Sequence, residues 1–206
     1  MIKATYLDHM GEDMDVADAA RVSFAKKAEG YSDEKNHKLI QYLAREGHIA
    51  PFGHCYLRFH IKAPIFVARQ LVKHKFMRMS EVSRRYVDSE PELYVPDVWR
   101  GRSADKKQGS DGVSHPPTWL DSTMNQVLDL YDQMIHDGVA PEQARMVLPQ
   151  STMTEWWWSG SLDAFADMCR LRCKPDAQAE TRIVANQISA DIKIVFPVAW
   201  AALMSI

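Results

Sequence analysis

A strictly alternating segment is the one clear strand pattern in a chain whose other regular patterns are helical. From Cys55 to Ile61 every second residue is apolar, and the residues between them are aromatic or basic. Because successive side chains of a strand point to opposite faces, this alternation predicts a half-buried strand. Pro64 then stands at a position typical of the first turn of a helix, and apolar residues continue to Val72. The chain must therefore place at least one strand against helices.

Further segments predict helices, because each repeats apolar residues at helical spacing and has a cap or a stop at one end. These segments are 33–46, 118–137, 141–148, 161–171 and 176–195. Helix therefore exceeds strand, and the predicted class is α+β. The stretch 100–117 is rich in glycine, proline and charged residues and lacks apolar periodicity. It predicts a mobile loop within a single domain that spans 1–206.

The composition argues against several classes of protein. The 25 basic and 27 acidic residues give a net charge of −2, so the whole chain is not a polycation built for nucleic acid or an anionic membrane. No apolar run approaches the roughly 20 residues of a membrane-spanning helix, and the first residues lack the layout of a signal peptide. The three cysteines form no C-x-x-C pair, which favours a reducing, cytoplasmic setting over a disulfide framework. No metal site is predicted.

The most basic segment is 69–86. Its six Lys or Arg residues and one acidic residue give a formal charge of +5 (6 − 1), and His74, Ser80 and Ser83 add further hydrogen-bonding groups. Such a cluster suits a phosphate-bearing ligand that several donors hold at once. Two other interpretations stay open at this point. One is a solvated basic face, and the other is non-specific nucleic-acid binding, against which the overall charge argues.

Single arginines also stand inside apolar stretches, at Arg21, Arg145 and Arg172. A buried arginine needs an anionic partner, which either a ligand or a structural salt bridge supplies. The cysteines offer no comparable signal for nucleophilic catalysis. Cys169 and Cys173 have basic neighbours in the sequence, but their spacing places them on a packed helix end.

Together these features resemble the flavin-dependent thymidylate synthase family. The family signature is Arg-His-Arg, seven further residues and then Ser, and this chain has Lys73-His74-Lys75, then Ser83, then Arg85-Tyr86. Other stretches are similar to the family and follow the family order. They are Ala19–Phe24, Gly47–His54, Phe59–Gln70, Ala144–Pro149, Thr154–Trp156, Leu171–Arg172 and Asp176–Glu180. Several matching stretches in one order are more specific than any single motif.

The resemblance implies an α+β fold with a central antiparallel or mixed sheet packed with helices. It also implies a homotetramer whose active sites lie at subunit interfaces. The implied reaction converts dUMP to dTMP, with methylenetetrahydrofolate as carbon donor and with FAD, reduced by NADPH, as hydride donor. No enzyme nucleophile attacks the base, so the protein positions its ligands and polarises the uracil.

The family's site residues carry over to matching positions. The implied dUMP-binding residues are Gln70, Ser83, Arg84, Arg85, Arg145 and Arg172. The implied catalytic residues are Arg172, Ser83 and His48. The implied FAD-binding residues are Ser23, Lys73, His74, Lys75, Ser80 and Glu81. Arginine suits a phosphate dianion because its planar fork donates two parallel hydrogen bonds, and Arg172 is the residue expected to face the uracil.

The flavin-side positions depart from the family pattern. Lys73 and Lys75 replace arginines, and Gly53 replaces a glutamate. Asp163, Asp167 and Asp176 stand where the family often has Arg, Asn and His. Lysine keeps the charge but loses the fork, and new carboxylates repel a pyrophosphate. Two alternatives therefore stay open. One is a folate-dependent hydroxymethylase of dUMP or a related pyrimidine nucleotide, and the other is a non-catalytic nucleotide-binding protein.

Overall fold

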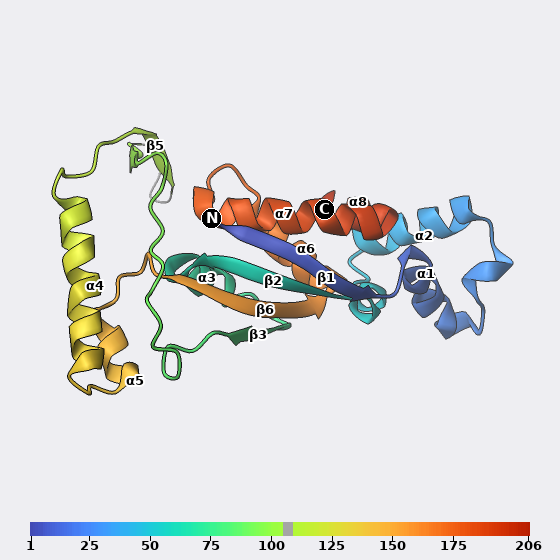
Figure 1. Ribbon diagram of the computed structural model, residues 1–206. Helices are drawn as coiled ribbons and strands as arrows, with labels where there is room; N and C mark the ends of the chain where they lie inside the picture. The colour runs from blue at the N-terminus through green and yellow to red at the C-terminus, as the bar shows by residue number, and fades with distance from the viewer. Residues whose placement is uncertain (105–108) are drawn as a thin grey trace.

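A four-stranded antiparallel sheet forms the centre of the computed structural model, which describes residues 1–104 and 109–206 (Figure 1). Its strands lie in the order β1-β2-β6-β3, so the last strand of the sheet in the sequence lies between two earlier ones. The strands are β1 (Lys3–Met10), β2 (Tyr56–Pro64), β3 (Met77–Glu81) and β6 (Met153–Ser161). The α+β class is confirmed, and every pairing within this sheet is antiparallel.

The strand predicted at 55–61 is β2, which continues to Pro64. Leu57, Phe59 and Ile61 are all buried, as the alternation requires. Strand β6, which the sequence did not reveal, contains three consecutive tryptophans. Trp156 and Trp158 are buried. Trp157 points to the other face and is 54% exposed.

Helices cover the face of the sheet that carries the buried residues of β2. Helix α6 (Leu162–Arg172) places Phe165 against Phe59 and Trp158, with ring centroids 5.3 and 5.5 Å apart. Figure 1 shows α7 (Ala179–Val195) running beside β1, and α8 (Pro197–Met204) packs against α6 and α7. The remaining helices of the same core are α1 (Asp13–Arg21), α2 (Asp33–Arg45) and α3 (Ile65–Leu71).

Helix boundaries follow the sequence signals where a cap is present. Helices α2 and α6 begin and end within one residue of the predicted limits. Helix α7 begins at Ala179 instead of 176. The proline at 197 ends α7 but also begins α8, because proline is well tolerated in the first turn of a helix. Short 3₁₀ turns lie at Val22–Phe24, Ala28–Gly30 and Ala50–His54.

The segment predicted as a loop at 100–117 contains regular structure. Strands β4 (Arg100–Arg102) and β5 (Ser110–Val113) pair antiparallel, so these residues form strands instead of a loop, while their mobility stays a prediction. Their pattern was missed because both strands are very short and carry few apolar residues. Residues 105–108 of the predicted loop lie outside the described part of the chain.

Helices α4 (Leu120–His136) and α5 (Pro141–Ala144) stand at the end of the molecule opposite α1 and α2 (Figure 1). The helix predicted at 118–137 is confirmed as α4, but only Tyr131 of its apolar stripe is fully buried. The helix predicted at 141–148 ends at Ala144 and continues as a 3₁₀ turn, Arg145–Val147. In the two described ranges no helix combines the length and apolar character that crossing a membrane requires.

Candidate active site

The end of α6 and the end of α3 bring three predicted site residues together. Arg172 is the last residue of α6, and its Nε donates to His74 Nε2 at 3.0 Å. Its Nη2 donates to the backbone carbonyl of Gln70 at 3.2 Å. Both acceptors are neutral, and no ion pair of Arg172 occurs within 1–104 and 109–206. The guanidinium charge is therefore uncompensated by the described part of this chain.

Burial sets the protonation of this cluster. Burial of the imidazole, and then the nearby charge of Arg172, lower the pKa of His74. Burial also lowers the pKa of Arg172, which remains the stronger base by far. Since Nε2 of a neutral His74 accepts from Arg172, the ring proton lies on Nδ1 and is available to a ligand.

The side chain of Gln70 is held by residues that the sequence did not single out. Its Nε2 donates to Gln178 Oε1 at 2.5 Å, and its Oε1 accepts from Thr181 Oγ1 at 3.1 Å. These partners are more than 100 positions away in the sequence, so only the fold brings them to α3. The one sequence signal was the family-like stretch from Asp176 to Glu180.

A second group of predicted site residues lines a separate cavity of about 480 Å³. Ser83, Arg84 and Arg145 lie on its wall, whereas the lining includes neither Gln70 nor Arg172. Four carboxylates, those of Glu81, Glu90, Glu92 and Glu155, share the same cavity. Lys62 lies 2.6 Å from Glu92 and 3.7 Å from Glu155, so part of this negative charge is compensated. In one protomer the predicted nucleotide residues therefore form two groups.

The turn that follows β3 carries Arg84, which is half-buried, and Arg85, which is exposed. Ser83 Oγ accepts from the backbone N–H of Arg85 at 3.3 Å, which shapes the turn. The guanidinium of Arg85 lies 5.1 Å from the ring centroid of Tyr86, and both side chains are exposed. Arg145 is also exposed and donates to the carbonyl of Glu142. Its apolar neighbours in the sequence do not bury it, and Met146 in the same 3₁₀ turn is exposed as well.

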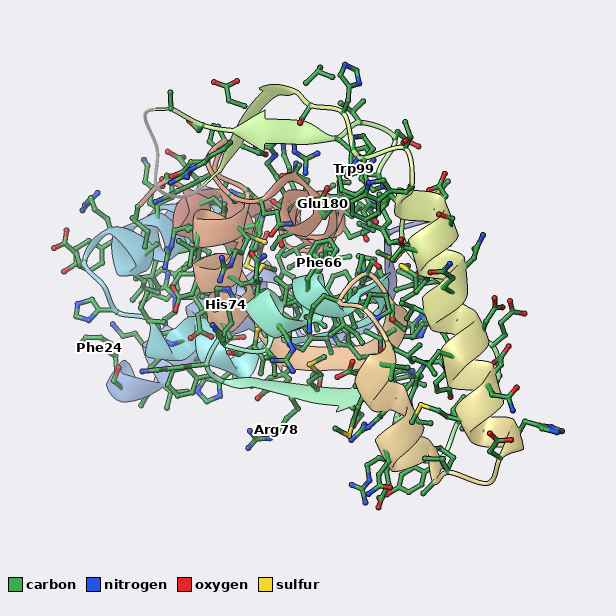
Figure 2. The ribbon with its side chains drawn as sticks, turned by 90° about the vertical axis from the view of Figure 1, so that its left-hand side faces the viewer. Phe24, Phe66, His74, Arg78, Trp99 and Glu180 are labelled. Carbon is green, nitrogen blue, oxygen red and sulfur yellow. The ribbon has the colours of Figure 1, made fainter. Side chains whose placement is uncertain are left out.

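Five of the six predicted flavin residues lie in the turn between α3 and β3 or on β3 itself, whereas Ser23 belongs to the 3₁₀ turn Val22–Phe24. The cation Arg78 of β3 lies among them in the sequence. Lys73, Lys75 and Arg78 are exposed, and no ion pair involves any of them in the described part of the chain. Phe76 in the same turn has φ +62 and is 74% exposed. Figure 2 shows Phe24, His74 and Arg78 toward the same lower-left part of the molecule.

The other implied residues have ordinary local contacts. Ser23 Oγ donates to the carbonyl of Ala20, and Ser80 is exposed on β3. Glu81 Oε1 accepts from Thr154 Oγ1 at 2.8 Å. His48 lies exposed in the turn after α2, with its ring centroid 6.1 Å from that of Tyr42. Nothing in the described contacts joins His48 to the Arg172 cluster.

Two of the replaced positions face each other. A side-chain carbon at Gly53 would lie 3.8 Å from Asp163 Oδ1, an oxygen that is buried and has no hydrogen-bond partner in 1–104 or 109–206. The resemblance places a glutamate and an arginine here, so this chain changes both members of a facing pair. The carboxylate of Asp167, another replacement, pairs with Arg170. The new negative charge is therefore partly compensated.

Comparison with known proteins decides the family. The family model described as "Thymidylate synthase complementing protein" matches residues 5–198. A flavin-dependent thymidylate synthase of Thermus thermophilus is 36% identical over 199 residues, which cover 95% of this chain and 73% of that protein. This chain belongs to the flavin-dependent thymidylate synthase family. The family's enzyme from Kosmotoga olearia is also 36% identical, over 95% of this chain and 87% of its own.

The fold agrees with that of a solved structure. The UMP/dUMP methylase PolB from Streptomyces cacaoi, bound with 5-Br dUMP, superposes with a TM-score of 0.86 and 28% sequence identity. The match covers 100% of this chain and 95% of the methylase. The family and the fold expected from the Lys73–Tyr86 signature are therefore both confirmed.

Proposed function

We propose that this chain methylates dUMP to dTMP. Methylenetetrahydrofolate supplies the carbon, FAD is the resident cofactor and NADPH is the reductant. The observation that carries the proposal is Arg172, a partly buried guanidinium with two neutral acceptors and no described carboxylate partner. A fixed cation of this kind stabilises negative charge as it develops on the uracil ring. Family membership and the dUMP-analogue-bound methylase of similar fold support the same substrate.

The phosphate of dUMP is assigned to Ser83, Arg84, Arg85 and Arg145. Exposed arginines near the cavity suit a dianion, and the carboxylates beside them restrict where the dianion can lie. In one protomer this group is separate from Gln70 and Arg172, which are assigned to the base. A complete site therefore needs groups from two subunits, which supports the proposal of a homotetramer with interfacial sites.

The residues present fit FAD. Three cations around the α3–β3 turn, Lys73, Lys75 and Arg78, have no described acidic partner and suit a diphosphate. Ser23 and Ser80 are exposed hydroxyls, Glu81 is an exposed carboxylate, and His74 offers Nδ1–H. When bound and reduced, FAD supplies the hydride. His48 and Ser83 are proposed as further catalytic residues that contact the bound nucleotide or cofactors. Arg172 is proposed to polarise the uracil ring.

Product analysis tests the proposal. The purified protein is incubated with dUMP, methylenetetrahydrofolate, FAD and NADPH, and the nucleotide product is identified by mass spectrometry. We expect dTMP from the wild type and from Arg102→Ala, a control that removes an exposed cation outside the proposed site. We expect Arg172→Ala to lose about 100- to 1000-fold in single-turnover rate.

Two other results identify the alternatives. A 5-hydroxymethyl product without NADPH oxidation favours the hydroxymethylase, and nucleotide binding without any product favours a binding protein. A parallel reaction with UMP is informative because the structurally similar enzyme is a UMP/dUMP methylase.

A further inference from the structure

A chain of hydrogen bonds links the proposed base-binding residue Gln70 to a buried carboxylate. We propose that Glu180 is a positioning residue that fixes the orientation of the Gln70 amide and thereby makes the site select uracil over cytosine. This inference rests on the proposed function, because it takes Gln70 as a contact of the nucleotide base. Figure 2 shows Glu180 in the upper centre of the view, between Trp99 and Phe66.

Glu180 lies in the first turn of α7 and is only 3% exposed. Arg100 Nη2 of β4 donates to its Oε1 at 2.5 Å, and Gln178 Nε2 donates to its Oε2 at 3.1 Å. Glu180 lines a cavity of about 520 Å³, and Phe66 and Trp99 line it as well. Their apolar surfaces lower the local dielectric, which strengthens the hydrogen bonds to the carboxylate.

The protonation state of Glu180 is set by opposing effects. Burial alone raises the pKa of a carboxyl, but hydrogen bonds from Arg100 and the backbone, together with the Arg100 charge, hold the pKa of Glu180 below its usual value. The group is therefore a carboxylate at neutral pH. An ionised carboxylate only accepts hydrogen bonds, so its neighbours must donate to it.

This constraint passes from residue to residue. Gln178 must direct its NH₂ group to Glu180, so its Oε1 faces Gln70 and accepts from Gln70 Nε2 at 2.5 Å. Gln70 must then direct its NH₂ group to Gln178, which leaves its Oε1 to accept from Thr181 at 3.1 Å. Every donor in the chain points toward Glu180. Reversal of the Gln70 amide alone would place its Oε1 against Gln178 Oε1, two carbonyl oxygens with no proton between them.

The fixed amide has a consequence for base recognition. After these contacts Gln70 keeps one N–H on Nε2 and one lone pair on Oε1. Uracil offers N3–H as a donor next to two carbonyl acceptors, whereas cytosine offers N3 as an acceptor next to an amino donor. The two patterns are related by a 180° flip of a glutamine amide. A Gln70 that cannot flip therefore reads only one of the two bases.

The test measures base selectivity by calorimetry, with dUMP and dCMP titrated separately into the intact protein. In Glu180→Gln the new amide can donate to Gln178, so the chain can reverse. In Gln178→Leu the contact that fixes the Gln70 amide is lost, and the Thr181 hydroxyl can either donate to Gln70 or accept from it. We expect each variant to lower the dUMP-to-dCMP affinity ratio about tenfold, the effect of one hydrogen bond. Thr152→Val removes a hydroxyl from another buried threonine, whose partner is Pro149, and should leave the ratio unchanged.

The outcomes separate this inference from the proposed function. If the wild type binds no dUMP, the proposed function fails and the inference fails with it. If the wild type binds dUMP and both variants keep its dUMP-to-dCMP ratio, the inference alone is overturned. In that case the contacts of Glu180 serve only to attach β4 to α7, and a lower melting temperature is their only effect. Gln178→Leu carries the test by itself if Glu180→Gln does not fold.

Discussion

The contact between Arg172 and His74 depends on the proton that His74 carries. The folded state lowers the pKa of His74, first through burial and then through the Arg172 charge. The unfolded chain therefore binds this proton more readily, so stability falls as pH falls through the usual histidine pKa of about 6.5 toward the lower folded value. Above about pH 6.5 by a unit or so, His74 is neutral in both states and its contribution to the free energy of unfolding is fully present.

We expect this effect to be visible in urea unfolding. Between about pH 7.5 and about pH 5 the wild type should lose more unfolding free energy than His74→Gln, which keeps an acceptor but does not titrate. An equal loss of unfolding free energy in the two proteins over this pH range would contradict the assignment of a neutral His74.

Individual residue roles were predictable only where a local pattern or the resemblance marked them. Arg172 and Ser83 stand in family-like stretches, so the sequence marked both as candidates, and their roles stay predictions. The contacts that orient Gln70 come from α7, more than 100 positions away, and local patterns carry no such information. Arg145 shows how little local composition says about exposure. It stands among apolar residues in the sequence, but its side chain in a short 3₁₀ turn is exposed.

At the scale of elements, the sequence predicted a helix or strand wherever apolar residues recurred at one regular spacing. Strand β2 alternates cleanly and α2 has both a cap and a stop, so both were found. Strand β6 was hidden because Trp157, on its exposed face, is as apolar as its buried neighbours. Strand β3 carries alternating Met and polar residues inside a basic segment, and charge concealed the pattern. Short edge strands and consecutive aromatic residues thus explain why most strands of the sheet were not predicted.

The turn between α3 and β3 offers a test of backbone strain. Phe76 adopts φ +62, a region that costs a residue with a Cβ about 1–2 kcal/mol. Its side chain is mostly exposed, so its removal loses little packing. Glycine relieves the strain but costs about 0.5–1 kcal/mol of entropy relative to alanine. We therefore expect Phe76→Gly to be more stable than Phe76→Ala by about 0.5–1 kcal/mol in urea unfolding. Equal or lower stability of the glycine variant would show that this turn is not strained.

At the scale of the whole molecule, several surfaces of one protomer are left uncovered. The sheet face opposite the core carries Tyr56, 42% exposed, and Trp157, 54% exposed. The apolar stripe of α4 is only half-buried, and this helix stands apart from the core (Figure 1). A single soluble protomer rarely leaves this much apolar surface exposed, which agrees with the proposed tetramer. The two separate groups of nucleotide residues lead to the same expectation.

Mixing of inactive subunits tests whether one site draws on two chains. Arg145→Ala and Arg172→Ala are each expected to be nearly inactive as uniform oligomers, because each removes one side of every site. If the phosphate group and the base group of a site come from different subunits, mixed oligomers contain native sites. Random co-assembly restores about a quarter of them, since each position is filled independently. The measurement is the dTMP-forming rate after co-expression of the two variants.

The matched control combines Gln70→Ala with Arg172→Ala. Arg172 donates to the backbone of Gln70 in the same chain, so both changes fall on one side of the site and no assembly restores it. We therefore expect recovery with the first pair and none with the second. Failure of both mixtures, with oligomers shown by mass to contain both variants, would place Arg145 and Arg172 of each site in a single chain. The proposal that one site draws on two subunits would then be overturned.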